Sequence, residues 1–296
     1  MKFNLYGDVK IFYRDTFNVL MRHEAQNLIP LGNIIIGNAG EDKTGWRDPA
    51  AWFMATVTDG ADILLTAVMT PPFNLTLYAA DNKINDSAID CLVKGMIAEN
   101  TAVPGIMSDN VLAERFAKAW AEKKNTAYSI AEKLRIHELR EVNPEIPETG
   151  KIRPLEEKDL SFFPYWVEGF NHDCFGNEAV PEADIDKYRY SIGRKKVYIL
   201  EHEGRAVSMA SKNREMQSVC GVGMVYTPPY FRGKGCASSC VASLSRLILD
   251  KGFSSCVLYT DLANPVSNSI YRKIGYMPVC DSLQIKFEGM QIYNRV

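Results

Sequence analysis

The sequence lacks a strong excess of charge of either sign and any long apolar run. Its formal net charge is only −2 over 296 residues, so it offers no global positive field that could collect nucleic-acid phosphates. The longest apolar stretches, such as residues 63–69, are far too short to cross a bilayer. These absences predict a protein with no nucleic-acid partner and no membrane partner.

Paired cysteine motifs and clustered histidines are also missing. The seven cysteines are scattered, odd in number and without a C-x-x-C pair, which favours reduced thiols that pack as small hydrophobic side chains. The single cluster of metal-type ligands, His172-Asp173-Cys174, favours a structural loop over a zinc site, so no metal is expected. Charged residues such as Arg14 and Glu24 interrupt every apolar run near the N-terminus. No signal-peptide core is therefore present, and a cytoplasmic location is expected.

The sequence does contain enough hydrophobic residues, 46% of the total, to build two cores. The segment 142–150 combines two prolines, polar and acidic residues and a closing glycine, which is typical of a linker. We therefore expect two domains, residues 1–145 and 151–296. Residues 1–150 hold 15 Lys or Arg and 20 Asp or Glu, a net charge of −5, whereas residues 151–296 hold 19 and 16, a net charge of +3. The slightly basic second half would suit a small anionic ligand.

Both halves show the same order of predicted helices and strands, which indicates a duplicated architecture although the residues themselves differ. In the first half, an amphipathic helix around residues 17–21 is followed by a hairpin that turns at Asp59-Gly60. In the second half, helical stretches from Leu160 and Ala183 precede a hairpin that turns at Glu203-Gly204. The elements predicted after the first hairpin are 73–78 (strand), 87–98 (helix), a strand near 105, 111–121 (helix) and 134–139 (strand). Those predicted after the second are 222–226 (strand), 237–249 (helix), 255–260 (strand), 265–274 (helix) and 283–287 (strand).

The most informative stretch is a glycine-rich turn that joins a predicted strand to a predicted helix, Arg232-Gly233-Lys234-Gly235-Cys236-Ala237. Glycines let backbone N–H groups converge without obstruction by a Cβ atom, and the helix N-terminus adds about half a positive charge. Such a turn suits a phosphate or pyrophosphate. It is neither a P-loop nor a G-x-G-x-x-G motif, since Ser238 stands where the third glycine would be. The alternative is a glycine-rich turn that binds no ligand.

Two motifs in this half resemble a known family. Arg232-x-x-Gly235-x-Ala237 is similar to the (Q/R)-x-x-G-x-(G/A) pyrophosphate loop of the GNAT superfamily of acetyl-CoA-dependent N-acetyltransferases. The later asparagine and the string Tyr271-x-x-x-Gly275-Tyr276 are similar to a second motif of that family. The resemblance covers residues 151–296 directly. It implies an α/β fold (α+β, mixed sheet) of tandem GNAT-like domains, each a central mixed, mostly antiparallel sheet flanked by helices.

The resemblance also implies acetyl-CoA as cosubstrate and a role for each matching residue. Asn264 would contact acetyl-CoA, and Asn268 is a further candidate for this contact. Tyr271 would act as general acid and protonate the departing thiolate after an unprotonated amine attacks the thioester. The residues whose backbone groups would bind the pantetheine arm, where their strand splays from its neighbour, are Val225, Tyr226 and Thr227. Those whose amides would hold the pyrophosphate are Arg232, Gly233, Lys234, Gly235, Cys236 and Ala237.

Several of these residues also have a purely structural interpretation. Asn264 before Pro265 is a good helix N-cap with proline at the first helical position. Tyr271 has isoleucines beside it on the predicted helix and would fit a core, and Cys236 would fit as a small filler. The acceptor, a small-molecule or peptide amine bound by the stretch 161–181, stays open, as does a homodimer. The candidates for the general base are Glu201, Glu215, Asp261 and an ordered water.

The first half has lost the features that predict a cofactor site. Between its third strand and the next helix, residues 79–86 contain no glycine, no arginine and two aspartates, which would repel a pyrophosphate. Alignment of Asn110 with Asn264 puts Ala117 where Tyr271 stands. We therefore expect one site, in the second half, and a first domain that adds stability, a wall of the acceptor cleft or an oligomer contact. The alternatives to an acetyltransferase are a non-catalytic acyl-CoA-binding or sensing module and a catalytically dead interaction protein.

Overall fold

The computed structural model of the chain describes residues 1–40, 48–176 and 185–289. These residues form two compact units. Unit 1 comprises the described parts of Met1–Ile136, Asp261–Ala263 and the described residues from Pro278 onward, and unit 2 comprises the described parts of His137–Thr260 and Asn264–Met277.

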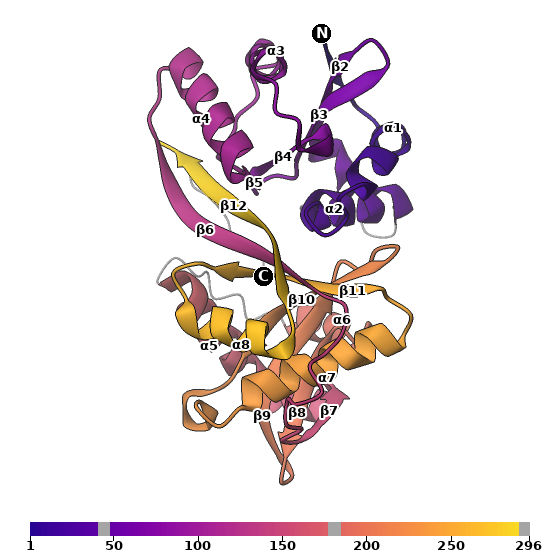
Figure 1. Ribbon diagram of the computed structural model, residues 1–296, viewed down its shortest axis with the longest axis vertical. Coiled ribbons are helices and arrows are strands. Elements are labelled where there is room, and N and C mark those ends of the chain that lie inside the picture. The colour runs from indigo at the N-terminus through magenta and orange to yellow at the C-terminus, as the bar shows by residue number, and fades with distance from the viewer. Residues whose placement is uncertain (41–47, 177–184, 290–296) are drawn as a thin grey trace. The chain divides into compact units, whose positions relative to one another are not determined.

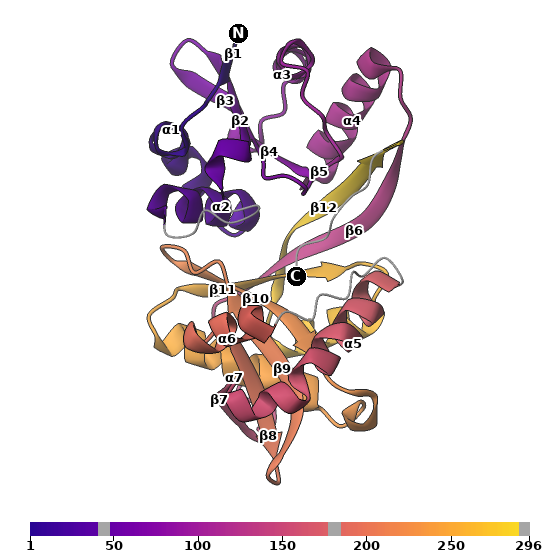
Figure 2. The ribbon, with the colours of Figure 1, turned by 180° about the vertical axis from the view of Figure 1, so that it is seen from behind.

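The two halves of the chain use one and the same order of elements, as Figures 1 and 2 show. The first series is β1 (Lys2–Leu5), α1 (Val9–Met21), α2 (Leu28–Ala39), β2 (Phe53–Asp59), β3 (Asp62–Met69), β4 (Leu75–Ala79), α3 (Asp86–Ala98), β5 (Gly105–Asp109), α4 (Asn110–Lys124) and β6 (Tyr128–Leu139). The second is β7 (Lys151–Pro154), α5 (Phe163–Phe175), α6 (Ile185–Gly193), β8 (Val197–His202), β9 (Arg205–Asn213), β10 (Val219–Tyr226), α7 (Cys236–Asp250), β11 (Ser255–Asp261), α8 (Pro265–Ile274) and β12 (Met277–Phe287). The predicted duplication of architecture is confirmed, and β1 and α2 are elements that the sequence patterns did not indicate.

The sheet of unit 1 is mixed, with strand order β1-β2-β3-β4-β5-β12-β6. The pairs β1/β2, β2/β3, β3/β4 and β5/β12 are antiparallel, and β4/β5 is parallel. The β2–β3 hairpin turns at Gly60, whose φ of 59° favours a residue without a Cβ atom. The turn predicted at Asp59-Gly60 is therefore confirmed.

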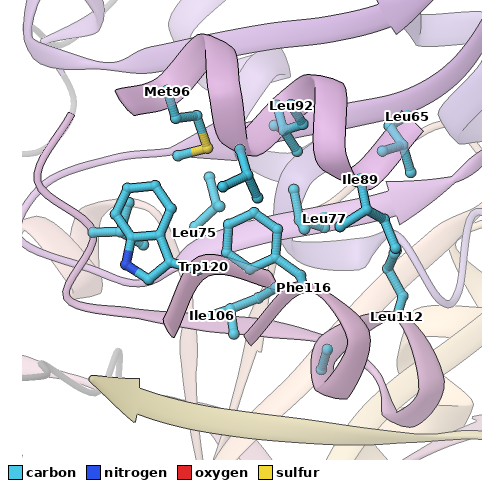
Figure 3. Close-up of a cluster of buried hydrophobic side chains, with 14 of the residues drawn as sticks. Leu65, Leu75, Leu77, Ile89, Leu92, Met96, Ile106, Leu112, Phe116 and Trp120 are labelled. Carbon is cyan, nitrogen blue, oxygen red and sulfur yellow. The ribbon is translucent and has the colours of Figure 1, made fainter. Parts of the chain in front are cut away.

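Helices α3 and α4 cover one face of this sheet. Their apolar side chains meet those of the strands in the buried cluster drawn in Figure 3, where Phe116 and Trp120 of α4 stack with ring centroids 6.0 Å apart. Burial of such side chains supplies about 25 cal/mol for each Å² of apolar surface removed from water. Leu77 of β4 points into this cluster, whereas the next residue, Tyr78, points to the opposite face. The Tyr78 hydroxyl lies 2.7 Å from Nδ1 of His23, which follows the C-terminal end of α1.

The sheet of unit 2 runs from the last residues of β6 through β11, β10, β9 and β8 to β7. The pair β10/β11 is parallel, and the pairs β9/β10, β8/β9 and β7/β8 are antiparallel. Successive residues of β8 alternate between two cores, since Tyr198 and Leu200 pack with α7 and α8 whereas Val197 and Ile199 pack with α5 and α6. The two pairs of helices therefore cover opposite faces of the sheet, which Figures 1 and 2 show from the two sides.

The last strand of each series ends in the unit built by the other series. From Pro278 onward β12 belongs to unit 1, where it pairs with β5 from Ser282↔Asp109 to Lys286↔Gly105. The last three residues of β6 belong to unit 2, where Leu139 is fully buried. The predicted domains, 1–145 and 151–296, are each one continuous stretch of the chain. The compact units are not, because hydrogen bonding and burial join the end of each of these two strands to the core of the other unit.

The segment 142–150, predicted as a linker, lies along unit 2. The Asn143 amide donates to the carbonyl of Ile274 at 2.8 Å, and its side chain donates to the carbonyl of Lys273 at 3.1 Å. These bonds satisfy carbonyl groups at the C-terminal end of α8, which have no partner inside the helix. Glu148 pairs with Arg246 of α7 at 3.0 Å. This segment is therefore a packed part of unit 2.

Two negative findings concern the described residues alone. Within residues 1–40, 48–176 and 185–289, every helix is too short or too polar to traverse a membrane. In this part of the chain, no three His, Cys, Asp or Glu side chains are grouped so that they could hold a metal ion.

Candidate functional site

Strands β10 and β11 separate just before the predicted anion-binding loop. They pair in parallel from Val219↔Ser255 to Gly221↔Val257, but both strands continue for several residues beyond this pairing. Past Gly221 the two backbones therefore share no ladder, which opens the sheet on the β11 side of residues 225–227. The predicted splay is present, and an extended ligand could add hydrogen bonds there as a further strand does.

A bulge in β10 marks the same place. The pairing with β9 shifts register between Gly223 and Tyr226, and Met224 between them has a φ of 47°. A non-glycine residue in this region costs of order 1 kcal/mol, and bulges are common beside active sites. On the β9 side the Ser208 hydroxyl donates to the Tyr226 carbonyl at 3.0 Å and lies 2.8 Å from the Thr227 hydroxyl. The end of β10 is thus held from one side and open on the other.

The loop after β10 presents backbone amides that lack acceptors. Gly233 and Gly235 have φ values of 75° and 77°, and a Cβ atom on Gly233 would meet nothing within 4 Å. Helix α7 begins at Cys236, and no side chain caps its N-terminus. Among the described residues, no backbone carbonyl accepts from the amides of residues 233–238. Free amides at a positive helix end form a cradle that fits a diphosphate.

The side chain of Arg232 holds this loop in place. Its Nε donates to the Thr227 carbonyl at 2.9 Å, and its Nη2 lies 2.5 Å from a carboxylate oxygen of Asp173 on α5. The guanidinium carbon is 5.7 Å from the centre of the Tyr226 ring. The Arg232 amide already donates to the Pro229 carbonyl at 3.2 Å. Arg232 therefore differs from the other five residues of the predicted pyrophosphate loop, since its side chain holds the loop in place and its amide is engaged.

The two side chains that follow in the loop differ in exposure. Lys234 is exposed, with its Nζ 4.5 Å from the centre of the Tyr230 ring. Cys236 is buried, and burial raises the pKa of its thiol, with Lys234 acting in the opposite direction. The thiol therefore stays protonated near neutral pH, which agrees with the interpretation of Cys236 as a small filler. Ala237 is half-buried in the first turn of α7.

The two asparagines of α8 are engaged in local structure. Asn264 is the N-cap, and its side-chain oxygen accepts from the Ser267 amide at 3.0 Å. The Asn268 side chain donates to the Asn264 carbonyl at 2.7 Å and accepts from the Thr260 hydroxyl at 2.8 Å. The capping interpretation of Asn264 is confirmed. Asn268 ties α8 to the end of β11 and so positions the helix that carries Tyr271.

Tyr271 lies in the core between α7 and α8 with 9% of its surface exposed. Its ring is 5.8 Å from that of Tyr276, and no hydrogen bond to its hydroxyl occurs among the described residues. Burial raises the pKa of Tyr271 well above its usual range, and the nearby thiols of Cys174 and Cys240 raise it further. The hydroxyl thus keeps its proton, and its bonding capacity is left for a ligand. A core position and a role as acid are compatible in this geometry.

The carboxylates that the sequence offers as general base all have partners. Glu201 accepts from Arg153 at 2.8 Å, and Glu215 pairs with Lys212. Asp261 accepts from the Ala263 amide at 2.8 Å. The geometry therefore selects none of the three as the base.

Helix α5 supplies contacts to the site that sequence patterns did not reveal. A Cβ atom on Gly169 would lie 2.3 Å from the Tyr226 hydroxyl oxygen, so only glycine allows the two to approach this closely. Trp166 packs on the same tyrosine with ring centroids 6.3 Å apart, and Asp173 holds Arg232. These three residues share one face of the helix, at i, i+3 and i+7. They belong to the predicted acceptor stretch 161–181, of which residues 177–181 lie outside the described residues.

The corresponding region of unit 1 is closed. Strands β4 and β5 pair at Leu75↔Ile106 and Thr76↔Met107, and just beyond these pairs the Ser108 hydroxyl donates to the Leu77 carbonyl at 2.8 Å. The N-terminus of α3 is capped by Asn85, whose side chain accepts from the Ala88 amide at 3.1 Å. Ala117 is fully buried in the core. This region therefore has a bridged strand pair and a capped helix where unit 2 has an opening and free amides.

Comparison with known family models finds a match to part of the second half of the chain. Residues 202–283, which include β10, the loop, α7, β11 and α8, match the family described as FR47-like protein. No curated protein matches the sequence significantly.

Solved structures match nearly the whole chain. A GCN5-related N-acetyltransferase from Sphaerobacter thermophilus has 12% identity and a TM-score of 0.62, with 96% of this chain and 95% of that chain covered. A GNAT-family acetyltransferase from Colwellia psychrerythraea has 13% identity and a TM-score of 0.57 over 97% and 99% of the two chains. A tandem GNAT protein from the clavulanic acid biosynthesis pathway has 10% identity and a TM-score of 0.54 over 97% of each chain. At such identities the similarity shows the fold, and the predicted fold class is confirmed.

Proposed function

We propose that this chain, which has a tandem GNAT fold with an FR47-like domain in its second half, is an acetyl-CoA-dependent N-acetyltransferase with one cofactor site, in unit 2. The observation that carries the proposal is the combination of free amides at residues 233–238, the splay beside Val225 to Thr227 and the unbonded hydroxyl of Tyr271. Separate features of unit 2 thus suit a diphosphate, an extended arm and a leaving group. The acceptor is proposed to be an amine of a small molecule or a peptide.

The residues of unit 2 offer partners for the diphosphate and the pantetheine arm of coenzyme A. The amides from Gly233 to Ala237 and the positive end of α7 would hold the diphosphate. Val225 to Thr227 would extend hydrogen bonding to the pantetheine arm, and Gly169 and Asp173 of α5 keep Tyr226 and Arg232 in place behind the loop. Asn264 and Asn268 are proposed to act through the position of α8, since their side chains bond within the β11–α8 turn.

Tyr271 is proposed as the general acid. When bound, acetyl-CoA supplies an acetyl group activated as a thioester. The Tyr271 phenol is protonated at neutral pH, since burial raises its pKa. It would deliver this proton to the sulfur as the thiolate departs, when the negative charge that develops there makes the sulfur a proton acceptor. Proton transfer by a positioned side chain contributes roughly 10²–10⁴ in rate.

Calorimetric titration of the full chain with acetyl-CoA tests the proposal. We expect about one molecule bound per chain, because unit 1 caps the helix end and bridges the strand pair that unit 2 leaves open. A stoichiometry of two would overturn the assignment of a single site, and absence of binding would overturn the function.

A screen for release of free coenzyme A over a library of amines tests turnover. We expect at least one class of amine to accelerate this release above the rate of hydrolysis without amine. Stoichiometric binding with no acceleration by any amine would favour the non-catalytic binding or sensing module instead.

A further inference from the structure

Within the described part of the chain, Thr149 carries one of the few buried polar atoms without a hydrogen bond. Its hydroxyl oxygen is shielded from solvent and has no partner among the described residues. Nearly all buried hydroxyl groups in folded proteins are bonded, and one left without a partner weakens the folded state. This residue belongs to the segment 142–150, which patterns of proline and glycine predict to be no more than a linker.

The backbone of Thr149 is held on both sides and at its own amide. The amide donates to the Ser239 hydroxyl of α7 at 3.0 Å. Glu148 before it pairs with Arg246 of α7 at 3.0 Å. Gly150 after it lies so close to β8 that a Cβ atom there would sit 2.4 Å from the Glu201 carbonyl oxygen. Because the backbone is fixed, only rotation about the Cα–Cβ bond can redirect the hydroxyl.

The side chain of Thr149 lies beside the first turn of α7. Its bonding partner Ser239 donates its own amide to the Gly235 carbonyl at 3.0 Å. The Thr149 Cγ2 atom is 4.0 Å from the position that a Cβ atom of Gly235 would take, and no other atom comes as near to that position. In this rotamer the methyl group faces the loop while the hydroxyl has no partner. A rotation of about 120° would bring the hydroxyl to the position of the methyl group and the methyl group to the position of the Cβ hydrogen.

We propose that Thr149 is a further binding residue for the cofactor diphosphate, and that its side chain rotates on binding so that the hydroxyl donates to a phosphate oxygen. The proposal rests on the function proposed above. A phosphate oxygen supplies the acceptor that the hydroxyl lacks in the free protein, and hydrogen bonds to charged acceptors are shorter and stronger than neutral ones. The segment that leads from one series of elements to the next would then also line the site.

Two variants of the full chain separate the hydroxyl from the methyl group. Thr149→Val keeps the shape and removes the hydroxyl, whereas Thr149→Ser keeps the hydroxyl and removes the methyl. For acetyl-CoA we expect the dissociation constant of Thr149→Val to rise roughly tenfold and that of Thr149→Ser to stay within a factor of about three of the wild type. S-acetylpantetheine, which has no diphosphate, should bind the wild type and Thr149→Val equally well.

The stability of the free protein provides a second measurement, because loss of a hydroxyl with a merely structural role would lower it. Replacing an unbonded hydroxyl by a methyl group is close to neutral or stabilising, so the midpoint of unfolding of Thr149→Val should not fall. Equal acetyl-CoA affinity in Thr149→Val and the wild type would overturn the role of Thr149 alone, as would an equal loss of S-acetylpantetheine binding. A wild-type chain that binds no acetyl-CoA would overturn this role together with the proposed function.

Discussion

At the scale of the residue, Tyr271 combines a buried ring with a hydroxyl that is not itself shielded from solvent. It is a core side chain, packed against α7 and the ring of Tyr276, yet its hydroxyl makes no hydrogen bond among the described residues. A ligand that reaches the opening between β10 and β11 would supply one.

The variant Tyr271→Phe should lower the turnover number roughly a hundredfold or more and leave acetyl-CoA affinity nearly unchanged, because proton delivery is lost while packing is kept. Stopped assays of coenzyme A release measure the turnover number, and calorimetry measures the affinity for acetyl-CoA. In the wild type, the raised pKa of Tyr271 keeps the phenol protonated as pH rises past its ordinary value near 10. The rate should therefore show no fall caused by Tyr271 below about pH 10, and equal turnover in Tyr271→Phe would leave it a core residue only.

At the scale of the element, the loop and the hairpins use the same backbone conformation for different purposes. Gly233 in the loop and Gly204 in the β8–β9 turn have φ values of 75° and 73°, and neither has an atom within 4 Å of its Cβ position. Any other residue is strained in this conformation by roughly 1 kcal/mol. In the β8–β9 turn this conformation closes a hairpin. In the loop it orients the backbone amides that lie at the N-terminal end of α7.

Gly233→Ala and Gly204→Ala form a matched pair, since the backbone strain is similar and no side-chain clash arises at either position. We expect Gly233→Ala to weaken acetyl-CoA binding about fivefold or more, because the strained loop no longer holds its amides in the binding arrangement. Gly204→Ala should lower the free energy of unfolding by about 1 kcal/mol and leave affinity unchanged. Calorimetry and urea titration measure both effects, and an equal change of affinity in the two variants would contradict the role of the loop.

At the scale of the whole molecule, the duplicated order of elements supports two unlike units. Unit 2 has a core with the fully buried thiols of Cys220, Cys240 and Cys256, and burial raises the pKa of each to about 12. An unfolded thiol ionises near pH 9. The folded state of unit 2 therefore holds these protons more tightly than the unfolded state does. This contribution to stability is complete below pH 9 and is lost as the pH rises from 9 toward 12.

Unit 2 should therefore lose stability steeply above pH 9, by up to about 1.4 kcal/mol per pH unit for each buried thiol. Brief proteolysis in urea at pH 8, 9 and 10, with peptides from α7 and α3 identified by mass spectrometry, follows unit 2 and unit 1 separately in the intact chain. Cys240→Ala should reduce the pH dependence of the α7 signal. The same pH dependence in Cys240→Ala and the wild type would show that this thiol does not control the alkaline loss.

Much of the fold and part of the site were predictable because they depend on residues close together in the chain. The Asp59-Gly60 turn, the alternating strands and the amphipathic helices follow from local conformational preference and hydrophobic period. The loop from Gly233 to Ala237 was predictable for the same reason, since positive φ angles and a following helix are local properties. A general base for the proposed reaction was not predictable, because its identity would depend on distances to an acceptor that no local pattern encodes.

The sequence by itself determined the order of elements apart from β1 and α2, the hairpin turns and the position of the glycine loop. Only the tertiary structure decided which strand ends belong to the other unit and that Asp173 holds the Arg232 side chain against the loop. It also decided that Ser108 bridges the strand pair in unit 1 and that Thr149 lies beside α7 with an unbonded hydroxyl. The physical reason is that these features are hydrogen bonds and burial between residues that are often distant in the chain. Which of these contacts form depends on how the complete surfaces of the helices and strands pack together. A short stretch of sequence does not determine that packing.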